Sequence, residues 1–275
     1  MACKVGCFTR LWRDVELEDA LTRAARAGFK YVGVLGSKGV PTPESPASEV
    51  RELKRMIEDN GLKFVTSWAH MPGTGDAEPF KRHLDIIAEL GGVGQLMAGP
   101  WPYKKFPDEL LPEDELAEKY RVFFDEVAQV MDYAAERNLE LMLKPHTGLS
   151  ATGKACVESV ERVNHPNFRI WYDPGNVSFY EGVRPEGDIV QVAKYTSGMC
   201  VKDHKGARAE ANFPTPGDGD VDWVRIFSTL KESGFDGPCI VEAVGAKTAE
   251  EADVQAVRVR EFLTRTLKAV GLEAE

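Results

Sequence analysis

The chain has 275 residues, of which 43% are hydrophobic and 28% charged, values typical of a soluble globule with a sizeable core. Its 44 acidic and 34 basic residues give a formal net charge of −10, which disfavours nucleic acid as a partner because a phosphate-backbone binder needs the opposite balance. No stretch approaches the ~18–20 uninterrupted apolar residues of a membrane helix, and charge comes too early at the N-terminus for a signal peptide, so we expect no membrane partner.

Short apolar runs alternate with longer amphipathic runs along the whole chain. The apolar runs, expected to be strands, cover residues 3–9, 30–36, 63–69, 94–99, 139–145, 168–174, 198–203 and 238–243. The amphipathic runs, expected to be helices, cover residues 16–27, 46–59, 78–90, 113–137, 152–162, 185–194, 222–233 and 248–270. Turn signals such as Ala27-Gly28 and Asn60-Gly61 separate a helix from the next strand, and Thr248 with Glu251 forms a capping box that opens the last helix.

Eight strand–helix units in ~250 residues predict a (β/α)8 barrel, an α/β fold, with residues 1–275 as a single domain. The strands are continuous apolar runs, as expected for a parallel sheet covered on both sides. The main alternative is a doubly wound open sheet, which usually carries a glycine-rich phosphate loop after its first strand. Here the chain reads CFTRLWRD, without such a motif, so we predict the barrel.

Cysteine usage indicates a reducing environment. The number of cysteines is odd and no CxxC spacing occurs, so neither a disulfide framework nor a structural zinc motif is indicated for Cys3, Cys7, Cys156, Cys200 and Cys239. Four of the five lie in apolar, strand-like runs, where a reduced cysteine serves as a small core residue. We therefore expect a cytoplasmic protein with free thiols.

The fold predicts where functional residues lie, because the active site of such a barrel forms at the C-terminal ends of its strands. The chemically capable residues at these ends are Thr9, Arg10, Trp68, His70, Lys144, His146, Asp173, Asn176, Cys200, Lys202, Asp203, His204 and Glu242. An unpaired buried carboxylate is costly, so Glu242 is interpreted as functional. Asp173 faces the same mouth, although in IWYDPGN it is also typical of an Asx turn. Lys144 needs an anionic partner, which either carboxylate supplies.

The histidines divide into two groups. His146, which directly follows Lys144-Pro145, is favoured as functional, whereas His70 and His204 stay open between a functional and a solvated role. His83 lies in the helical run EPFKRHLDIIAEL, and His165 precedes a proline. We predict that both of these are surface residues.

An ordered set of phrases resembles the xylose isomerase-like barrels, specifically the sugar phosphate isomerase/epimerase group related to endonuclease IV. These phrases are CFTRLW, AARAGFKYVGV, LELMLKPHTG, IWYDPGN, CVKDHKG, PGDGDVDWVRIFSTLKESGFDGP and IVEA. Together they span nearly the whole chain in the expected order. The resemblance implies the barrel fold and an enzyme of carbohydrate metabolism.

The resemblance also implies one divalent metal, often Mn²⁺, held by Glu, Asp, His and Glu at the ends of strands five to eight. In that family the metal polarises a ketose carbonyl, and the two glutamates exchange a proton at the neighbouring carbon. Asp173 and Glu242 match two ligands, whereas Lys144 and Cys200 stand where the family has a Glu and the His. An ammonium at that position opposes a metal, since two unit charges ~4 Å apart repel by roughly 4 kcal/mol at an effective dielectric near 20.

Three interpretations of Lys144 follow. In the first, the metal is lost and Lys144 pairs with Asp173 and Glu242. In the second, a Mn, Mg or Zn ion shifts outward to Asp173, Glu242 and His204, with His146 as a further candidate ligand. In the third, Lys144 is a Schiff-base nucleophile. Cys200 is interpreted as a core thiol rather than a ligand because of its apolar strand position.

The leading hypothesis is an isomerase, epimerase or lyase that acts on a small keto-sugar or inositol derivative by proton abstraction next to a carbonyl. Glu242 is the candidate base, and Lys144 or His146 stabilises the enolate oxygen. The segment 97–106 is expected to cross the mouth. Candidate substrate-binding residues are Trp68, His70, Trp101, Lys202 and Asp203. The alternative for the aromatic side chains is packing of a loop onto the rim.

Two other functions remain as alternatives. One is a non-catalytic sugar-binding or regulatory barrel with a degenerate metal site, for which Lys144 and Cys200 are the argument. The remote one is DNA repair of the endonuclease IV type, which is disfavoured by the net charge, by only five histidines, and by Asn176 at a position where that zinc cluster requires a His. The long helical runs 113–137 and 248–270 are candidate interfaces of a homo-oligomer.

Overall fold

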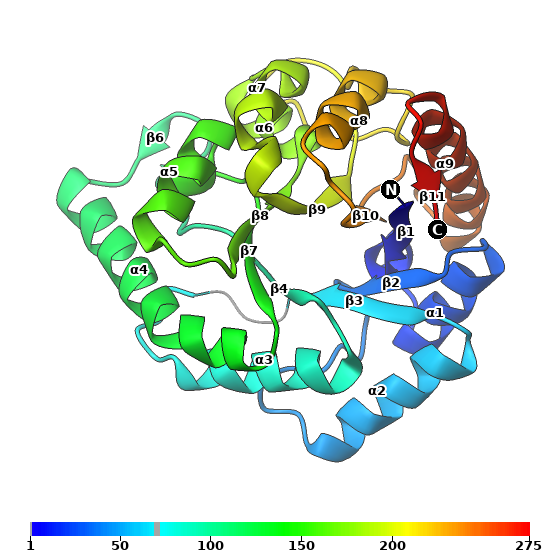
Figure 1. Ribbon diagram of the computed structural model, residues 1–275, viewed down its shortest axis with the longest axis horizontal. Helices are drawn as coiled ribbons and strands as arrows, with labels where there is room; N and C mark the ends of the chain where they lie inside the picture. The colour runs from blue at the N-terminus through cyan, green and yellow to red at the C-terminus, as the bar shows by residue number, and fades with distance from the viewer. Residues whose placement is uncertain (1, 69–71) are drawn as a thin grey trace.

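A computed structural model describes residues 2–68 and 72–275 of the chain. Within these residues eight parallel strands close into a barrel, because the last strand pairs back onto the first (Figure 1). The barrel strands follow one another around the ring as β1 (Ala2–Phe8), β2 (Tyr31–Val34), β3 (Lys63–Ser67), β4 (Gly94–Met97), β7 (Glu140–Leu143), β8 (Phe168–Tyr172), β9 (Thr196–Val201) and β10 (Pro238–Val241). The predicted (β/α)8 barrel is confirmed.

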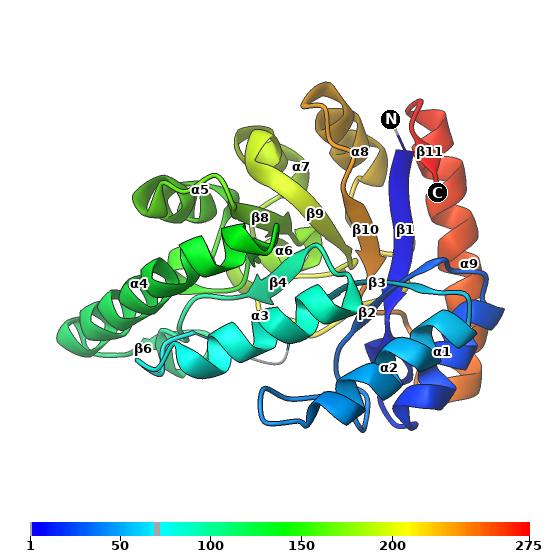
Figure 2. The same ribbon diagram turned by 60° about the horizontal axis from the view of Figure 1, so that its bottom comes forward.

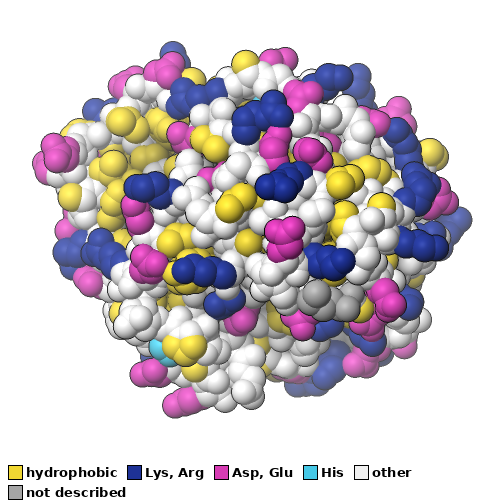
Figure 3. All heavy atoms as spheres, turned by 45° about the horizontal axis from the view of Figure 1, so that its top comes forward, with side chains coloured by type: hydrophobic (Ala, Val, Ile, Leu, Met, Phe, Trp, Pro, Cys, Tyr) yellow, Lys and Arg dark blue, Asp and Glu magenta, His cyan; other side chains and the backbone are white. Residues whose placement is uncertain are grey.

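Helices surround the barrel on its outer face (Figures 1 and 2). They are α1 (Leu17–Arg26), α2 (Ala47–Asp59), α3 (Glu78–Leu90), α4 (Glu113–Glu136), α5 (Gly153–Val163), α6 (Pro174–Glu181), α7 (Pro185–Val192), α8 (Trp223–Glu232) and α9 (Ala249–Ala269), with short 3-10 helices at Thr9–Trp12, Gly148–Ser150 and Ala193–Tyr195. Among the described helices, none combines the length and the apolar character needed to cross a bilayer. Basic and acidic side chains are interspersed over the face shown in Figure 3.

The inside of the barrel is a small core of its own. Each barrel strand contributes one buried side chain to it, namely Phe8, Tyr31, Val65, Leu96, Met142, Trp171, Cys200 and Ile240. The large rings fit because the neighbouring strand carries glycine: a Cβ on Gly198 would lie 2.1 Å from the Trp171 ring, and a Cβ on Gly33 would lie 2.4 Å from the Phe8 ring. This filled interior leaves the strand ends as the place where polar side chains meet.

One helix and three short strands, besides the 3-10 helices, were not predicted from the sequence. Helix α6 begins directly after Asp173, which the sequence left open as an Asx turn, because Pro174 favours a first helical position and the Asp173 side chain accepts the backbone N–H of Asn176 at 2.9 Å. A hairpin of β5 (Tyr103–Lys105) and β6 (Glu109–Leu110) follows β4. A short strand, β11 (Glu273–Ala274), pairs in parallel with the start of β1 (Figure 2).

The surface prediction for His83 is wrong. Its imidazole is only 1% exposed and lies between two polar side chains of the barrel, with Nε2 at 2.7 Å from Ser67 Oγ and Nδ1 at 2.9 Å from Gln95 Oε1. The helical pattern placed His83 on α3 correctly. Its side chain is nevertheless buried, because Ser67 on β3 and Gln95 on β4 provide polar partners for both ring nitrogens. His165 is partly exposed.

Candidate active site

Five charged side chains from five strand ends form one cluster at the C-terminal mouth of the barrel. They are Arg10 after β1, Lys144 after β7, Asp173 after β8, Lys202 after β9 and Glu242 after β10, and ion pairs join them to one another. All except Arg10 are buried. Because the parallel strands bring their ends to one rim, residues up to 232 positions apart in the chain become neighbours.

Lys144 lies at the centre of this cluster. Its Nζ is 2.7 Å from Asp173 Oδ2 and 2.7 Å from Glu242 Oε2, and its side chain is 2% exposed. Burial alone would lower the pKa of Lys144, but the attraction of the two carboxylates outweighs burial and raises the pKa above its ordinary value. The ammonium therefore stays protonated at neutral pH, which disfavours the Schiff-base interpretation because that chemistry needs the free amine.

Four groups contact the two carboxylate oxygens of Glu242. Oε2 accepts from Lys144 and from the Cys200 thiol at 3.0 Å, while Oε1 lies 3.2 Å from Lys202 Nζ and 3.7 Å from Arg10. Burial would raise the pKa of Glu242, but the cations, Lys144 foremost, hold it well below its ordinary value of 4.5. Glu242 is therefore a carboxylate whose charge is shared among several donors.

Lys202 is positioned by Asn176 on α6. The ammonium donates to Asn176 Oδ1 at 2.7 Å and lies 4.7 Å from the centre of the Phe213 ring. The Asn176 amide in turn donates to the carbonyl of Pro145 at 2.7 Å, so that both ends of the side chain are bound. The sequence placed Asn176 among the polar residues at the strand ends and noted it as a missing histidine, but its contact with Lys202 was not predicted.

Asp203, predicted to bind substrate, is bound entirely by its own loop. Its carboxylate accepts N–H groups from the backbone of His204, Gly217, Gly219 and Val221 and from the Trp223 indole, at 2.9 to 3.3 Å. The backbone donors come from the segment between β9 and α8, and Trp223 is the first residue of α8. The carboxylate holds that loop in place through both its oxygens, and the substrate-binding role of Asp203 stays a prediction.

His146 and Trp68 line an aromatic pocket of about 380 Å³ beside the charged cluster, together with Trp101 and Lys119. The Lys144 ammonium lies 5.2 Å from the centre of the Trp68 ring, so the pocket adjoins the cluster. His146 Nε2 is 3.0 Å from the Tyr180 hydroxyl, and burial, reinforced by nearby lysines, lowers the pKa of His146 to about 3. The imidazole is therefore neutral at neutral pH. His70 lies outside the described residues.

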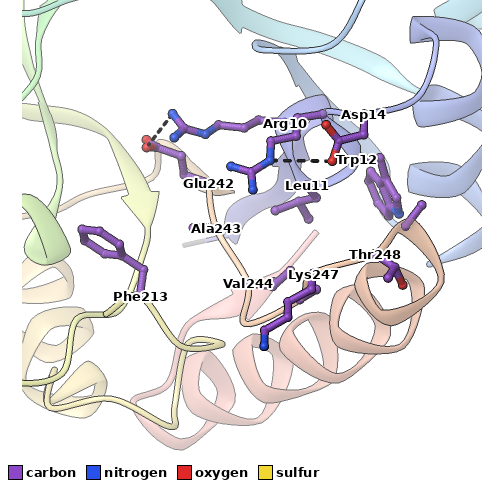
Figure 4. Close-up of a pocket in the computed structure, with 13 residues that line it drawn as sticks. Arg10, Leu11, Trp12, Asp14, Phe213, Glu242, Ala243, Val244, Lys247 and Thr248 are labelled. Atoms are coloured by element: carbon purple, nitrogen blue, oxygen red, sulfur yellow. Dashed lines mark ion pairs between the residues drawn. The ribbon is translucent and has the colours of Figure 1, made fainter. Parts of the chain in front are cut away.

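A second pocket opens on the other side of Glu242 (Figure 4). It has a volume of about 190 Å³ and is lined by Arg10, Trp12, Phe213, Glu242 and Lys247, among others. The Arg10 side chain points toward the Glu242 carboxylate in this view. Glu242 thus lines this pocket, and its Oε2 also contacts Lys144, whose ammonium lies near the Trp68 ring of the aromatic pocket.

Two further residues that shape the mouth gave no signal in the sequence. Glu126 on α4 is fully buried and accepts the backbone N–H groups of Gly73, Thr74 and Gly75, which follow β3. Tyr180 on α6 binds His146, as described above. Glu126 lies on an amphipathic helix and Tyr180 lies in a loop-like segment. Both residue types are common in such places for structural reasons, so neither residue is recognisable as part of the site before the fold is known.

The sequence model of the family described as xylose isomerase-like TIM barrel matches residues 21–265, and the chain belongs to this family. It is 22% identical to an inosose dehydratase from Geobacillus thermodenitrificans over 92% of this chain and 90% of that protein. It is 29% identical to a putative L-ribulose-5-phosphate 3-epimerase from Shigella dysenteriae over 94% and 84%, respectively.

Two solved structures share the fold. One is a D-psicose 3-epimerase in the presence of D-fructose, with a TM-score of 0.76, 17% identity, and coverage of 96% of this chain and 99% of that chain. The other is the 3-keto-D-glucoside 4-epimerase of E. coli, with a TM-score of 0.72, 17% identity, and coverage of 94% and 99%. These relatives and neighbours are enzymes that act on sugars or inositol derivatives.

Members of this family commonly bind a divalent metal, but the residues at this site do not fit one. Among the described residues, Asp173, Cys200 and Glu242 bring three potential donor atoms within 4.8 Å of one another. The Lys144 ammonium already contacts both carboxylates, and burial raises the pKa of Cys200 well above its ordinary 9.0, so its sulfur is a neutral thiol. Trp171 Nε1 donates to that sulfur at 3.2 Å, which supports the core-thiol interpretation.

His204, a predicted metal ligand, lies against a backbone carbonyl and two aromatic rings. Its Nε2 is 2.8 Å from the carbonyl oxygen of Glu210, and its ring lies beside Phe179 and Phe213, with centroids 5.8 and 5.6 Å away. His204 does not belong to the three-residue donor group found in the described part of the chain.

Proposed function

We propose that this chain is an isomerase, epimerase or lyase that abstracts a proton next to the carbonyl of a small keto-sugar or inositol derivative. The observation that carries the proposal is a buried carboxylate, Glu242, flanked by the ammonium groups of Lys144 and Lys202. A base beside two cations is suited to enolate formation, because the cations stabilise the negative oxygen that appears as the proton leaves. Similarity to inosose dehydratase and to sugar epimerases supports the substrate class.

In the proposed reaction Glu242 takes a proton from the carbon next to the carbonyl. The C–H electron pair forms the C=C bond of an enolate, and the former carbonyl oxygen becomes negative. Lys144 has two ion-pair partners among the described residues, and an ammonium has three donors, so one remains for this oxygen. Protonated Glu242 then returns the proton at the other carbon, or gives it to a neighbouring hydroxyl, which leaves as water while the enolate electrons form the new C=C bond. In an epimerisation the enolate takes a proton from solvent water on its opposite face, and Glu242 releases its own proton to solvent.

The low basicity of Glu242 is compatible with this role. Its Oε1 partners, Lys202 at 3.2 Å and Arg10 at 3.7 Å, are the looser ones. When a substrate oxygen attracts these cations, they withdraw part of their charge from Glu242, and its pKa rises toward its ordinary value. Substrate binding thus activates the base.

The aromatic pocket is the proposed sugar site. The Trp68 ring lies next to Lys144, Trp101 lines the same pocket, and neutral His146 is a hydrogen-bonding group for a substrate hydroxyl. The five free, buried cysteines support a reducing, cytoplasmic setting for the reaction.

The test is deuterium exchange in D₂O, followed by proton NMR. The panel contains an inosose, D-psicose, D-fructose, L-ribulose 5-phosphate and a 3-keto-glucoside. We expect deuterium at the carbon next to the carbonyl of at least one compound, with loss of exchange in Glu242→Gln. The matched control is Glu232→Gln, the same change on the exposed face of α8.

Two results would overturn the proposal. Binding of a panel sugar without exchange or turnover would select a non-catalytic sugar-binding barrel. Undiminished exchange in a folded Glu242→Gln variant would show that the base is another residue.

A further inference from the structure

We propose that the Lys144 ammonium is the built-in cation of this site, that it occupies the position between Asp173 and Glu242, and that it excludes a divalent metal. Two polar contacts define that position. Nζ lies 2.7 Å from one oxygen of each carboxylate, and all three side chains are at least 97% buried. A metal bound by these same two oxygens would have to share their space with the ammonium.

The local charge opposes a metal as well. Lys144, Lys202 and Arg10 place three cations around two carboxylates, so the cluster is already positive. A divalent ion would add two more charges inside a buried site, where repulsion is screened least. The third potential metal ligand, Cys200, would have to lose its thiol proton, which now forms a hydrogen bond to Glu242.

Lys144 has little room to leave. Its side chain is enclosed by the barrel, its Nζ lies 5.2 Å from the centre of the Trp68 ring, and its backbone N–H donates to Met97 of the neighbouring strand. Moving it would also strip the two buried carboxylates of their shared partner, which is costly. The ammonium is therefore a fixed part of the site.

The catalytic consequence rests on the proposed function: Lys144 supplies to the enolate oxygen the positive charge that a metal would otherwise supply. Occupancy of the cation position does not rest on it, and can be measured without any substrate. The two ideas are therefore separable by experiment.

The experiment measures metal binding. Wild-type protein is loaded with Mn²⁺ and desalted, and its metal content is measured by elemental mass spectrometry. The same is done for Lys144→Glu, which places a third carboxylate beside Asp173 and Glu242. The matched control is Lys205→Glu, which reverses an exposed charge on the loop after β9.

We expect wild type and the control to retain far less than one metal per chain. Lys144→Glu is expected to bind Mn²⁺ at least about a hundredfold more tightly than wild type, because a repelling cation is replaced by an attracting anion. The affinity is measured by titrating the protein with Mn²⁺ and recording the electron paramagnetic resonance spectrum of the ion. Circular dichroism shows whether Lys144→Glu folds. The thermal midpoint of wild type, measured with and without Mn²⁺, tests the proposal even if the variant does not fold.

Stoichiometric Mn²⁺ in wild type, or a rise of its thermal midpoint with Mn²⁺, would overturn the proposal. A folded Lys144→Glu variant that gains no affinity would also overturn it. Deuterium exchange that survives EDTA treatment of wild type would support the catalytic part. Absence of exchange with the whole panel would count against the proposed function and would leave the metal result intact.

Discussion

Lys202 and Asn176 are joined by a hydrogen bond of 2.7 Å between the ammonium and the side-chain carbonyl. The amide of the same asparagine donates to Pro145, which directly follows Lys144. One residue of α6 therefore connects the ends of β7 and β9 and sets the position of the second lysine relative to the first. This arrangement makes Asn176 a positioning residue of the site.

Asn176→Ala is expected to lower the free energy of unfolding by about 1–3 kcal/mol, because buried partners lose their hydrogen bonds. It should also lower kcat more than it changes KM, since Lys202 loses its holder. Urea unfolding and steady-state kinetics measure the two effects. The control is Asn167→Ala, which removes a similar amide bond, to Leu139, at the opposite end of the barrel. Equal losses of kcat in both variants would contradict a positioning role.

Lys144→Met is expected to lower the free energy of unfolding by about 3–5 kcal/mol at neutral pH, because two buried carboxylates lose their shared cation. In wild type the folded-state pKa of Glu242 lies below its ordinary value of 4.5. The Glu242 carboxylate therefore stabilises the folded state above pH 4.5, and this stabilisation is lost as the pH falls through the folded-state pKa. In the variant, burial favours the protonated carboxyl, which stabilises the folded state as the pH falls.

The difference in stability between wild type and Lys144→Met should therefore shrink from neutral toward mildly acidic pH. Urea unfolding at several pH values measures it. A difference that stays constant over this range would show that the ion pairs with Asp173 and Glu242 do not determine the stability of the cluster.

Asp203→Asn is expected to loosen the loop between β9 and α8. An amide has one accepting oxygen where the carboxylate offers two charged ones, and hydrogen bonds to a charged group contribute about 1.5–3 kcal/mol each. Amide hydrogen exchange at Gly217, Gly219 and Val221 should become faster. If exchange stays slow and only KM rises, Asp203 returns to the substrate-binding role that the sequence suggested.

Trp101→Ala tests the aromatic pocket. Trp101 is 42% exposed and lies with its ring centroid 5.9 Å from that of His146. We expect KM to rise by about two- to tenfold with little change in stability, because aromatic contacts contribute ~0.5–1.5 kcal/mol. Leu110→Ala, on the exposed strand β6 of the hairpin that follows Trp101, is the control. Equal effects of the two substitutions on KM would count against a sugar site at Trp101.

Much of the fold follows from patterns that are local in the chain. Apolar runs separated by amphipathic ones specify eight strand–helix units, and the closed ring follows because parallel strands need covering helices on one side and a filled interior on the other. The same rule placed Lys144, Asp173 and Glu242 at one rim, and the structure brings the three into contact.

The details that the sequence did not reveal depend on partners far apart in the chain. His83 has a helical pattern typical of a surface position, and only Ser67 and Gln95 on two strands make its burial favourable. Asp203 stands at a strand end like a functional residue, yet its donors come from a loop of irregular shape. Hydrophobic periodicity does not predict loop conformation, so these partners are identified only in the folded structure.

The two oxygens of Asp173 serve two different elements. Oδ1 accepts the N–H of Asn176 at the start of α6, and Oδ2 pairs with Lys144. Near the other end of that helix, Tyr180 binds His146 and accepts Arg208 through its backbone carbonyl. One carboxylate therefore holds both the central cation of the site and the start of a helix whose other end contacts His146. The charged cluster and the aromatic pocket are thus joined through one short helix, so a substitution of Asp173 should disturb both.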